Sequence, residues 1–223
     1  MSLSFEDTLP QRLAMCTTGA SLYARGYVHA SAGNISLKLD DGSFLITPTD
    51  ACLGTLQAAD LAHVAHGMQL SGAPASKTLA LHQAIYEAEP HARCIIHTHA
   101  THLVSLTLQG VWQPQDIVPP ITPYYVMKVG HVPLIAYQRP GHPEVARQVA
   151  QAIHQGHAHS KPLRAVMLDR LGPVVWHSSP AQASAVLEEL EETAKLWLMS
   201  HKTATPLSPA QLDDLRQHFG AVW

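Results

Sequence analysis

Two spacings of apolar residues recur along the chain, and each predicts a different kind of element. Helical spacing predicts helices over residues 6–25, 77–88, 143–154 and 181–199, a stretch ending at 105, and a short helix starting at Ser208-Pro209. Short apolar runs predict strands over residues 35–39, 44–47, 93–97, 132–137, 165–168 and 173–176. Helices and strands therefore intermix along the whole length, which favours the α/β class.

Turn residues divide these elements. Gly26 ends the first predicted helix, and Asp40-Asp41-Gly42 predicts a tight hairpin between the first two strands. A weaker hairpin is expected at His66-Gly67, and the proline-rich residues 114–123 are expected to form a loop. No internal repeat and no linker interrupts the pattern, so we expect residues 1–223 to form one domain.

Composition narrows the class of partner. The chain has 223 residues, of which 46% are hydrophobic and 14% charged, enough to bury one full core. A net charge of −3, without a run of Lys or Arg, disfavours a nucleic-acid surface. No apolar stretch approaches the ~18 residues that cross a membrane. We therefore expect a small-molecule partner rather than nucleic acid or a membrane.

The cysteines and the first residues indicate the compartment. Cys16, Cys52 and Cys94 are odd in number and scattered, as expected for reduced thiols. Glu6 and Asp7 stand where a signal peptide would be basic. We expect a cytoplasmic protein.

Two histidines at His97-Thr98-His99 follow the apolar run 94–96. Alternate residues of a strand point to the same face, so both imidazoles leave the strand end side by side, as two ligands of one metal ion would. A chance pair is possible because the chain has 16 histidines. The position at a strand end, where α/β proteins build their sites, favours the metal interpretation.

Several motifs occur in a shared order: Ser31-Ala32-Gly33-Asn34-Ile35-Ser36, Ile46-Thr47-Pro48-Thr49, Ser76 before a helix, and His97-Thr98-His99. In this order and spacing they resemble the class II aldolase/adducin family over nearly the whole chain. The segments 74–77 and 123–130 are most similar to its branch of 3-oxo-tetronate 4-phosphate decarboxylases.

The resemblance implies a three-layer α/β/α sandwich around a mostly antiparallel central sheet, as in class II aldolases. It also implies a homotetramer with sites at subunit interfaces, a divalent metal, usually zinc, and a phosphorylated sugar or sugar acid as substrate. The metal ligands would include His97 and His99.

By the resemblance, Asn34, Thr49 and Ser76 fall on phosphate-binding positions. Short polar side chains and backbone N–H groups at turns suit an anion with up to two charges. Lys77 stands where aldolases carry a hydroxyl residue, and could add a cation to the phosphate or receive a substrate carboxylate. Each motif alone is equally compatible with an ordinary turn or a solvated helix start.

Two positions depart from the aldolase pattern. Thr78 occupies the place of a glutamate that serves aldolases as metal ligand and proton-transfer base. Leu171 occupies the place of a third histidine ligand and cannot bind a metal. A usual catalytic zinc site has three protein ligands, so a replacement is needed. We consider His131 first and His177 second; Tyr124, Tyr125 and Lys128 lie in the same segment as His131.

The loss of the glutamate is compatible with decarboxylation. An aldolase in the synthetic direction removes a proton beside a carbonyl and needs a base, whereas loss of CO2 from a 3-oxo acid creates a similar enediolate without one. We expect decarboxylation of 3-oxo-tetronate 4-phosphate to dihydroxyacetone phosphate, with Lys77, Thr78 and Tyr125 as candidate catalytic residues.

Two alternatives stay open. One is a sugar-phosphate aldolase of the fuculose phosphate type. The other is a non-catalytic, adducin-like binding or assembly module. Thr78 and Leu171 favour it, because they replace the glutamate and the third histidine of the aldolase pattern. An assembly module has no physical need of the phosphate-loop residues. The sequence leaves the substrate's stereochemistry and the metal's identity open.

Overall fold

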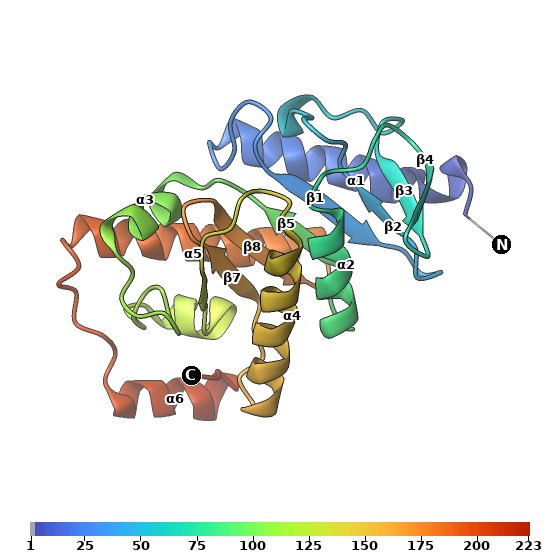
Figure 1. Ribbon diagram of the computed structural model, residues 1–223. Helices are drawn as coiled ribbons and strands as arrows, with labels where there is room; N and C mark the ends of the chain where they lie inside the picture. The colour runs from blue at the N-terminus through green and yellow to red at the C-terminus, as the bar shows by residue number, and fades with distance from the viewer. Residues whose placement is uncertain (1–2) are drawn as a thin grey trace.

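An eight-stranded sheet forms the middle of the computed structural model, which describes residues 3–223 (Figure 1). Its strand order is β4-β3-β2-β1-β5-β8-β7-β6. The strands are β1 (Asn34–Lys38), β2 (Phe44–Ile46), β3 (Ala62–Ala65), β4 (Met68–Ser71), β5 (Cys94–His97), β6 (Leu134–Ile135), β7 (Ala165–Leu168) and β8 (Gly172–His177). Every neighbouring pair is antiparallel except β6 with β7, so the expected mostly antiparallel sheet is confirmed.

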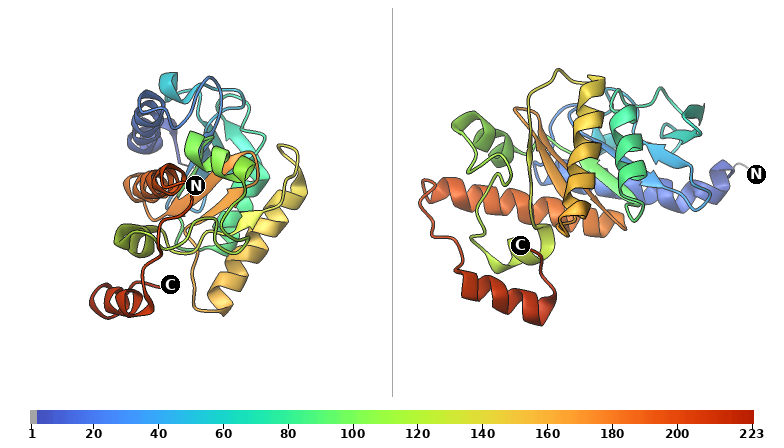
Figure 2. Two further views of the ribbon diagram at one scale, coloured as in Figure 1. Left: turned by 90° about the vertical axis from the view of Figure 1, so that its left-hand side faces the viewer. Right: turned by 60° about the horizontal axis from the view of Figure 1, so that its bottom comes forward.

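Helices cover both faces of the sheet. On one face lie α2 (Leu79–Ala88) and α4 (Pro143–Ala158), which pack against each other; on the other lie α1 (Phe5–Ala24), α3 (Thr101–Gln109) and α5 (Pro180–Met199) (Figures 1 and 2). The burial of β5 follows this division: Ile95 packs in the cluster beneath α2 and α4, whereas Cys94 and Ile96 pack in the opposite cluster. The expected three-layer sandwich is confirmed.

The alternation of β5 also determines where its last residue points. Side chains two apart share a face, so His97 follows Ile95 toward α2 and α4. Antiparallel pairing places Asn34, the first residue of β1, directly opposite His97. On the other side of β5, His97 pairs with Val174 of β8. The end of the central strand is thus held from both sides.

Proline and serine signals mark several helix starts. Pro143 opens α4 after His142, whose Nδ1 accepts a hydrogen bond from the Glu144 N–H, and Pro180 opens α5 after Ser179. A capping box at Ser208 starts the C-terminal helix α6 (Pro209–Phe219). These starts agree with the sequence prediction to within a residue.

Some elements differ from the prediction. The expected strand over 132–137 reduces to the two residues of β6, because Pro133 has no N–H to donate and Tyr137 already lies 58% exposed. α2 begins two residues late, since the Ser76 hydroxyl accepts from the Thr78 N–H in a turn. A short 3₁₀ turn, η1 (Leu53–Thr55), and a π-helical turn, η2 (Tyr125–Val129), were not expected.

The helices and the cysteines bear on membrane insertion and on disulfide bonds. Within residues 3–223, none of the helices combines the length and apolarity that crossing a bilayer demands. All three cysteines are free, and Cys94 on β5 is completely buried.

Candidate active site

A cavity of about 310 Å³ opens at the sheet end where β1 and β5 meet the first turns of α2 and α4. The predicted site residues that line it are Asn34, Thr49, Ser76, Lys77, Thr78, His97, His99 and Leu171. Five segments that are spread over residues 34–171 thus contribute to one cavity, as α/β folds build their sites.

His97 and His99 lie side by side in this cavity, with ring centroids 5.1 Å apart. His97 is 2% exposed, and its Nδ1 lies 2.9 Å from the Pro173 carbonyl oxygen. Since a carbonyl only accepts, Nδ1 carries the proton. Burial, with a smaller contribution from His99, lowers the pKa of His97 to about 4, so the ring is neutral at pH 7 and its Nε2 keeps a lone pair.

This arrangement fits a divalent metal. Metal-binding histidines usually donate their second N–H to a carbonyl or carboxylate, and the Pro173 carbonyl takes that role for His97. Burial, with a smaller effect of His29, also lowers the pKa of His99, which favours the neutral, metal-binding form. The cavity therefore offers two neutral imidazoles as metal ligands.

A chain of buried hydrogen bonds orients Asn34. Its Oδ1 lies 2.6 Å from His82 Nε2, His82 Nδ1 lies 2.7 Å from Ser36 Oγ, and Ser36 Oγ lies 2.8 Å from the Tyr86 hydroxyl. Burial lowers the pKa of His82 to about 3, so it carries one proton. Because Asn34 Oδ1 accepts that proton, Ser36 donates to His82 Nδ1 and Tyr86 to Ser36.

The consequence of this chain is that the Asn34 amide has a fixed direction. Its oxygen faces His82, and its NH2 group remains available to the cavity, which Asn34 lines. An NH2 group donates and cannot accept, so it suits an anion. His82 itself lies fully buried behind Asn34.

Hydroxyl side chains continue the donor set. Ser76 Oγ and Thr78 Oγ1 are 2.9 Å apart, and both residues line the cavity. The Thr49 backbone N–H already donates to the Pro74 carbonyl at 2.8 Å, so Thr49 offers its hydroxyl rather than its amide. These short side chains lie on the same cavity wall as the start of α2.

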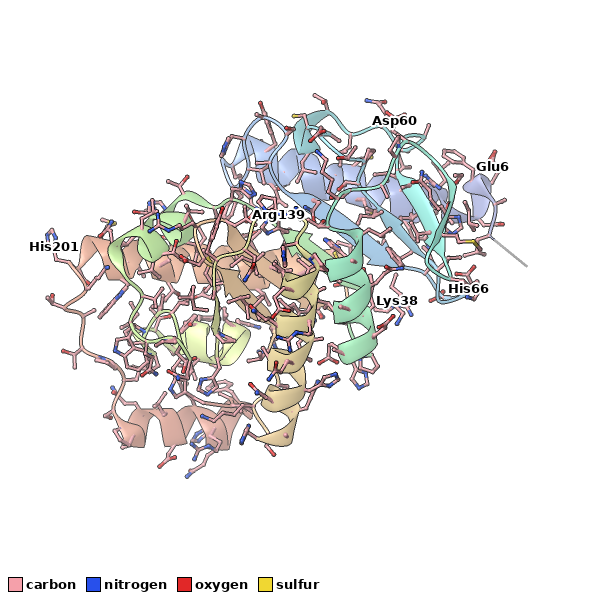
Figure 3. The ribbon with its side chains drawn as sticks, in the orientation of Figure 1. Glu6, Lys38, Asp60, His66, Arg139 and His201 are labelled. Atoms are coloured by element: carbon pink, nitrogen blue, oxygen red, sulfur yellow. The ribbon has the colours of Figure 1, made fainter. Side chains whose placement is uncertain are left out.

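Cationic groups complete the walls. Lys77 Nζ lies 3.3 Å from Asp50 in an exposed ion pair, and Arg139 enters from the loop before α4 (Figure 3). The first residues of α2 and α4 both line the cavity, and helix N-termini favour negative charge. The cavity therefore presents two helix starts and two cations to an anionic ligand. Asp50 is the only carboxylate among the described lining residues.

Two predicted residues lie away from this cavity in the same chain. His131 Nδ1 bonds Asp116 at 2.8 Å, its ring stacks on Trp223 at 4.5 Å, and its Nε2 is buried without a described partner. Tyr125 is fully buried, with its ring 5.6 Å from Trp223. Neither residue reaches His97 or His99 from within one chain. Of the further candidates, Lys128 and His177 also do not line the cavity.

Sequence reasoning missed Arg139, His142 and His82. Arg139-Pro140-Gly141-His142 joins β6 to α4, and a cation with Pro and Gly just before a helix start is a signal that could have indicated an anion site. His82 gives no such signal, because an apolar helix face can carry a buried histidine for packing alone.

Comparison with known proteins agrees with this geometry. The family model for the class II aldolase and adducin N-terminal domain matches residues 13–198. A 3-oxo-tetronate 4-phosphate decarboxylase of Cupriavidus necator is 55% identical over 227 residues, covering 99% of this chain and 100% of the relative. The enzyme of that name from Escherichia coli K12 is 38% identical, covering 92% and 94%.

Solved structures share the fold. The E. coli protein YgbL superposes with a TM-score of 0.84 at 37% identity, covering 93% of this chain and 98% of that one. An L-fuculose 1-phosphate aldolase superposes with a TM-score of 0.81 at 20% identity, covering 94% and 95%, and supports the fold alone.

Proposed function

The chain belongs to the class II aldolase/adducin family, and from that premise we propose that it is a lyase that decarboxylates 3-oxo-tetronate 4-phosphate to dihydroxyacetone phosphate and CO2. Relatives that carry this activity in their names cover almost the full chain.

One observation carries the proposal: a single cavity joins two neutral imidazoles to donors for two anions. The substrate has a phosphate at one end and a carboxylate at the other, with an oxo group between them. Asn34, Thr49 and Ser76 supply phosphate donors, and Lys77 and Arg139 supply cations. A ligand with one anionic end would need fewer of these groups.

The proposed binding mode follows from these positions. The phosphate lies against Asn34 and the hydroxyls of Thr49 and Ser76 at the start of α2. The carboxylate end faces Lys77 and Arg139, whose charges recognise it on entry. The oxo group then lies toward His97 and His99.

Thr78 fits a reaction that needs no base. Decarboxylation breaks the bond between C1 and C2, CO2 leaves, and the electron pair passes to C2 and the 3-oxo oxygen. No proton is removed, so a hydroxyl can replace a glutamate beside the reacting carbons. C2 then takes one proton, for which the Lys77 ammonium and the Thr78 hydroxyl are our candidate donors, since both line the cavity.

His97 and His99 would hold a divalent metal, for which we propose zinc. Bound there, the ion would act as a Lewis acid that polarises the 3-oxo group. The residues around it position the substrate and exclude water: Leu168 and Leu171 add apolar walls to the cavity.

We further propose a cytoplasmic homotetramer of single-domain chains, with each site completed by a neighbour. Large apolar side chains that lie exposed in one chain support an assembly, among them Tyr124 (59%), Phe219 (66%) and Met199 (67%). Tyr125 and His131 lie against Trp223 inside their own chain, so a role for either at a neighbour's metal stays a prediction.

The test is an assay for both products. Purified protein loaded with zinc should release CO2 and form dihydroxyacetone phosphate from 3-oxo-tetronate 4-phosphate. The variant His97→Ala/His99→Ala should lose this activity while circular dichroism shows that it is still folded.

Two outcomes would contradict the proposal. Without CO2 release, an aldol product from dihydroxyacetone phosphate and an aldehyde would indicate an aldolase. A protein that forms neither product, and whose melting temperature no phosphorylated sugar acid raises, would indicate a non-catalytic module.

A further inference from the structure

A second hollow lies directly beside the cavity and shares His99 and Leu171 with it. By the family resemblance, Leu171 occupies the position of a third histidine ligand. The lining of this hollow also includes His29 and Arg170. Of its described lining residues, His29 is the one additional side chain whose nitrogen can bind a metal, because the Arg170 guanidinium keeps its proton.

His29 comes from the loop between α1 and β1, a segment far in sequence from Leu171. Its ring centroid lies 6.3 Å from that of His99, edge to face at 73°. His97 and His99 are 5.1 Å apart. Two imidazoles bound to one ion at about 2.1 Å have centroids roughly 5 to 6 Å apart. The three rings therefore form a row around His99, with His29 slightly beyond ligand distance.

The His29 side chain is able to close this gap. Among residues 3–223, no three His, Cys, Asp or Glu side chains already converge as a metal site, so a ring must move. His29 is exposed, and no hydrogen bond to its ring is found in the described residues. A rotation toward His99 therefore breaks no described interaction, and a ligand bond repays the lost side-chain freedom.

We propose that His29 is the third protein ligand of the divalent metal, reaching it from the hollow that His29 lines together with Leu171. The ion would take its nitrogens from His29, His97 and His99 and leave a position open for substrate. This inference rests on the proposed function only in requiring the same metal. It places the replacement ligand in the same chain as the other two, not in His131 of a neighbour.

The test measures metal affinity without any reaction. Zinc dissociation constants would be obtained by competition with a chromophoric chelator for the wild type, His29→Ala, and the double variant His29→Ala/Leu171→His. His154→Ala is the matched control, since His154 is an exposed histidine on α4 outside both hollows. Cobalt absorption spectra of the same proteins would report a change in the ligand set.

We expect His29→Ala to weaken zinc binding by at least about 100-fold, because even residues behind a ligand cost 10–100-fold when changed. Its cobalt spectrum should change, while His154→Ala matches the wild type. Leu171→His in the double variant should restore affinity by offering the third imidazole from residue 171, which lines the same hollow.

The inference is overturned if His29→Ala binds zinc as the wild type does and gives its cobalt spectrum, or if the wild type binds no metal. Circular dichroism would show whether each variant is folded. If the double variant is unfolded, the zinc affinity of His29→Ala alone decides the test. An intact zinc site without decarboxylation would refute the proposed function and leave the role of His29 standing.

Discussion

The Asn34 amide faces the cavity with its NH2 group because His82 holds its oxygen. Asn34→Asp keeps an acceptor for His82 but replaces the cavity donor with a carboxylate oxygen. We expect the KM for the phosphorylated substrate to rise by at least about tenfold, because a repelled charge replaces a charge-assisted hydrogen bond. Steady-state kinetics would measure it.

A matched amide-to-acid change is available on the surface. Gln151→Glu adds the same charge on α4, outside the cavity. Its KM should stay within twofold of the wild type. Equal KM values for Asn34→Asp and the wild type would show that the amide does not contact the phosphate.

His82 also predicts how stability depends on pH. Its pKa is about 3 in the folded protein against an ordinary value of 6.5, because burial disfavours the charged ring. The unfolded chain therefore takes up a proton first, and folding is progressively disfavoured as pH falls from 6.5 toward 3. By pH 5 the His82 contribution lowers the free energy of unfolding by about 2 kcal/mol.

Urea unfolding of the metal-free protein at pH 7 and pH 5 would test this. His82→Gln keeps a donor for Asn34 and cannot take up the proton. Its loss of stability between the two pH values should be smaller than that of the wild type by about 2 kcal/mol. An identical pH dependence would mean that His82 is not the buried neutral group described above.

At the level of elements, Gly172 lets β8 approach the backbone of Thr98 and His99 closely. A Cβ added there would lie 2.0 Å from the Thr98 carbonyl oxygen, and Gly172 has φ +136°. Gly172→Ala should lower the free energy of unfolding by more than about 3 kcal/mol, because strain and overpacking add. The change also displaces Thr98, which lies between His97 and His99 in the chain.

Gly42 provides the comparison. Its φ is +85° in the turn after β1, but no atom lies within 4 Å of an added Cβ. Gly42→Ala should therefore cost only about 1 kcal/mol from backbone strain. Similar losses for the two variants in chemical denaturation would contradict the close approach of β8 to Thr98.

The elements themselves were largely predictable, because their signals are local. The apolar pattern predicted α5 to within a residue at its start, and the Ser208-Pro209 signal predicted where α6 begins. The π-helical turn η2 was not predictable, since its sequence, rich in apolar residues, gives no distinct periodicity. β6 was overestimated because pairing partners, not side-chain pattern, decide where a short edge strand ends.

The site was predictable only where a motif lies within one segment. His97 and His99 share a strand end, and the family resemblance placed Asn34, Thr49 and Ser76 near them. Arg139 lines the cavity and His29 lines the neighbouring hollow, both through loops that only the tertiary fold brings close. For such residues the sequence shows only the residue type. Their closeness to the cavity follows from the order of the strands in the sheet.

At the scale of the whole molecule, the proposed tetramer gives a direct expectation. Light scattering on the eluted protein should give a mass four times the 24.2 kDa of one chain. Exposed apolar side chains such as Tyr124, Met199 and Phe219 would be buried between copies. A mass of one chain at micromolar concentration would remove the shared-site arrangement.

The bond between His97 and the Pro173 carbonyl joins residues 76 positions apart. A ribosome makes His97 and His99 long before it makes Pro173, so the nascent chain carries the two imidazoles without the carbonyl that selects the tautomer of His97. β5 also cannot form its hydrogen bonds with β8 until residues 172–177 have been made. The proposed metal site would therefore be complete only after Pro173 has emerged, and metal binding would then be a late event in the protein's maturation.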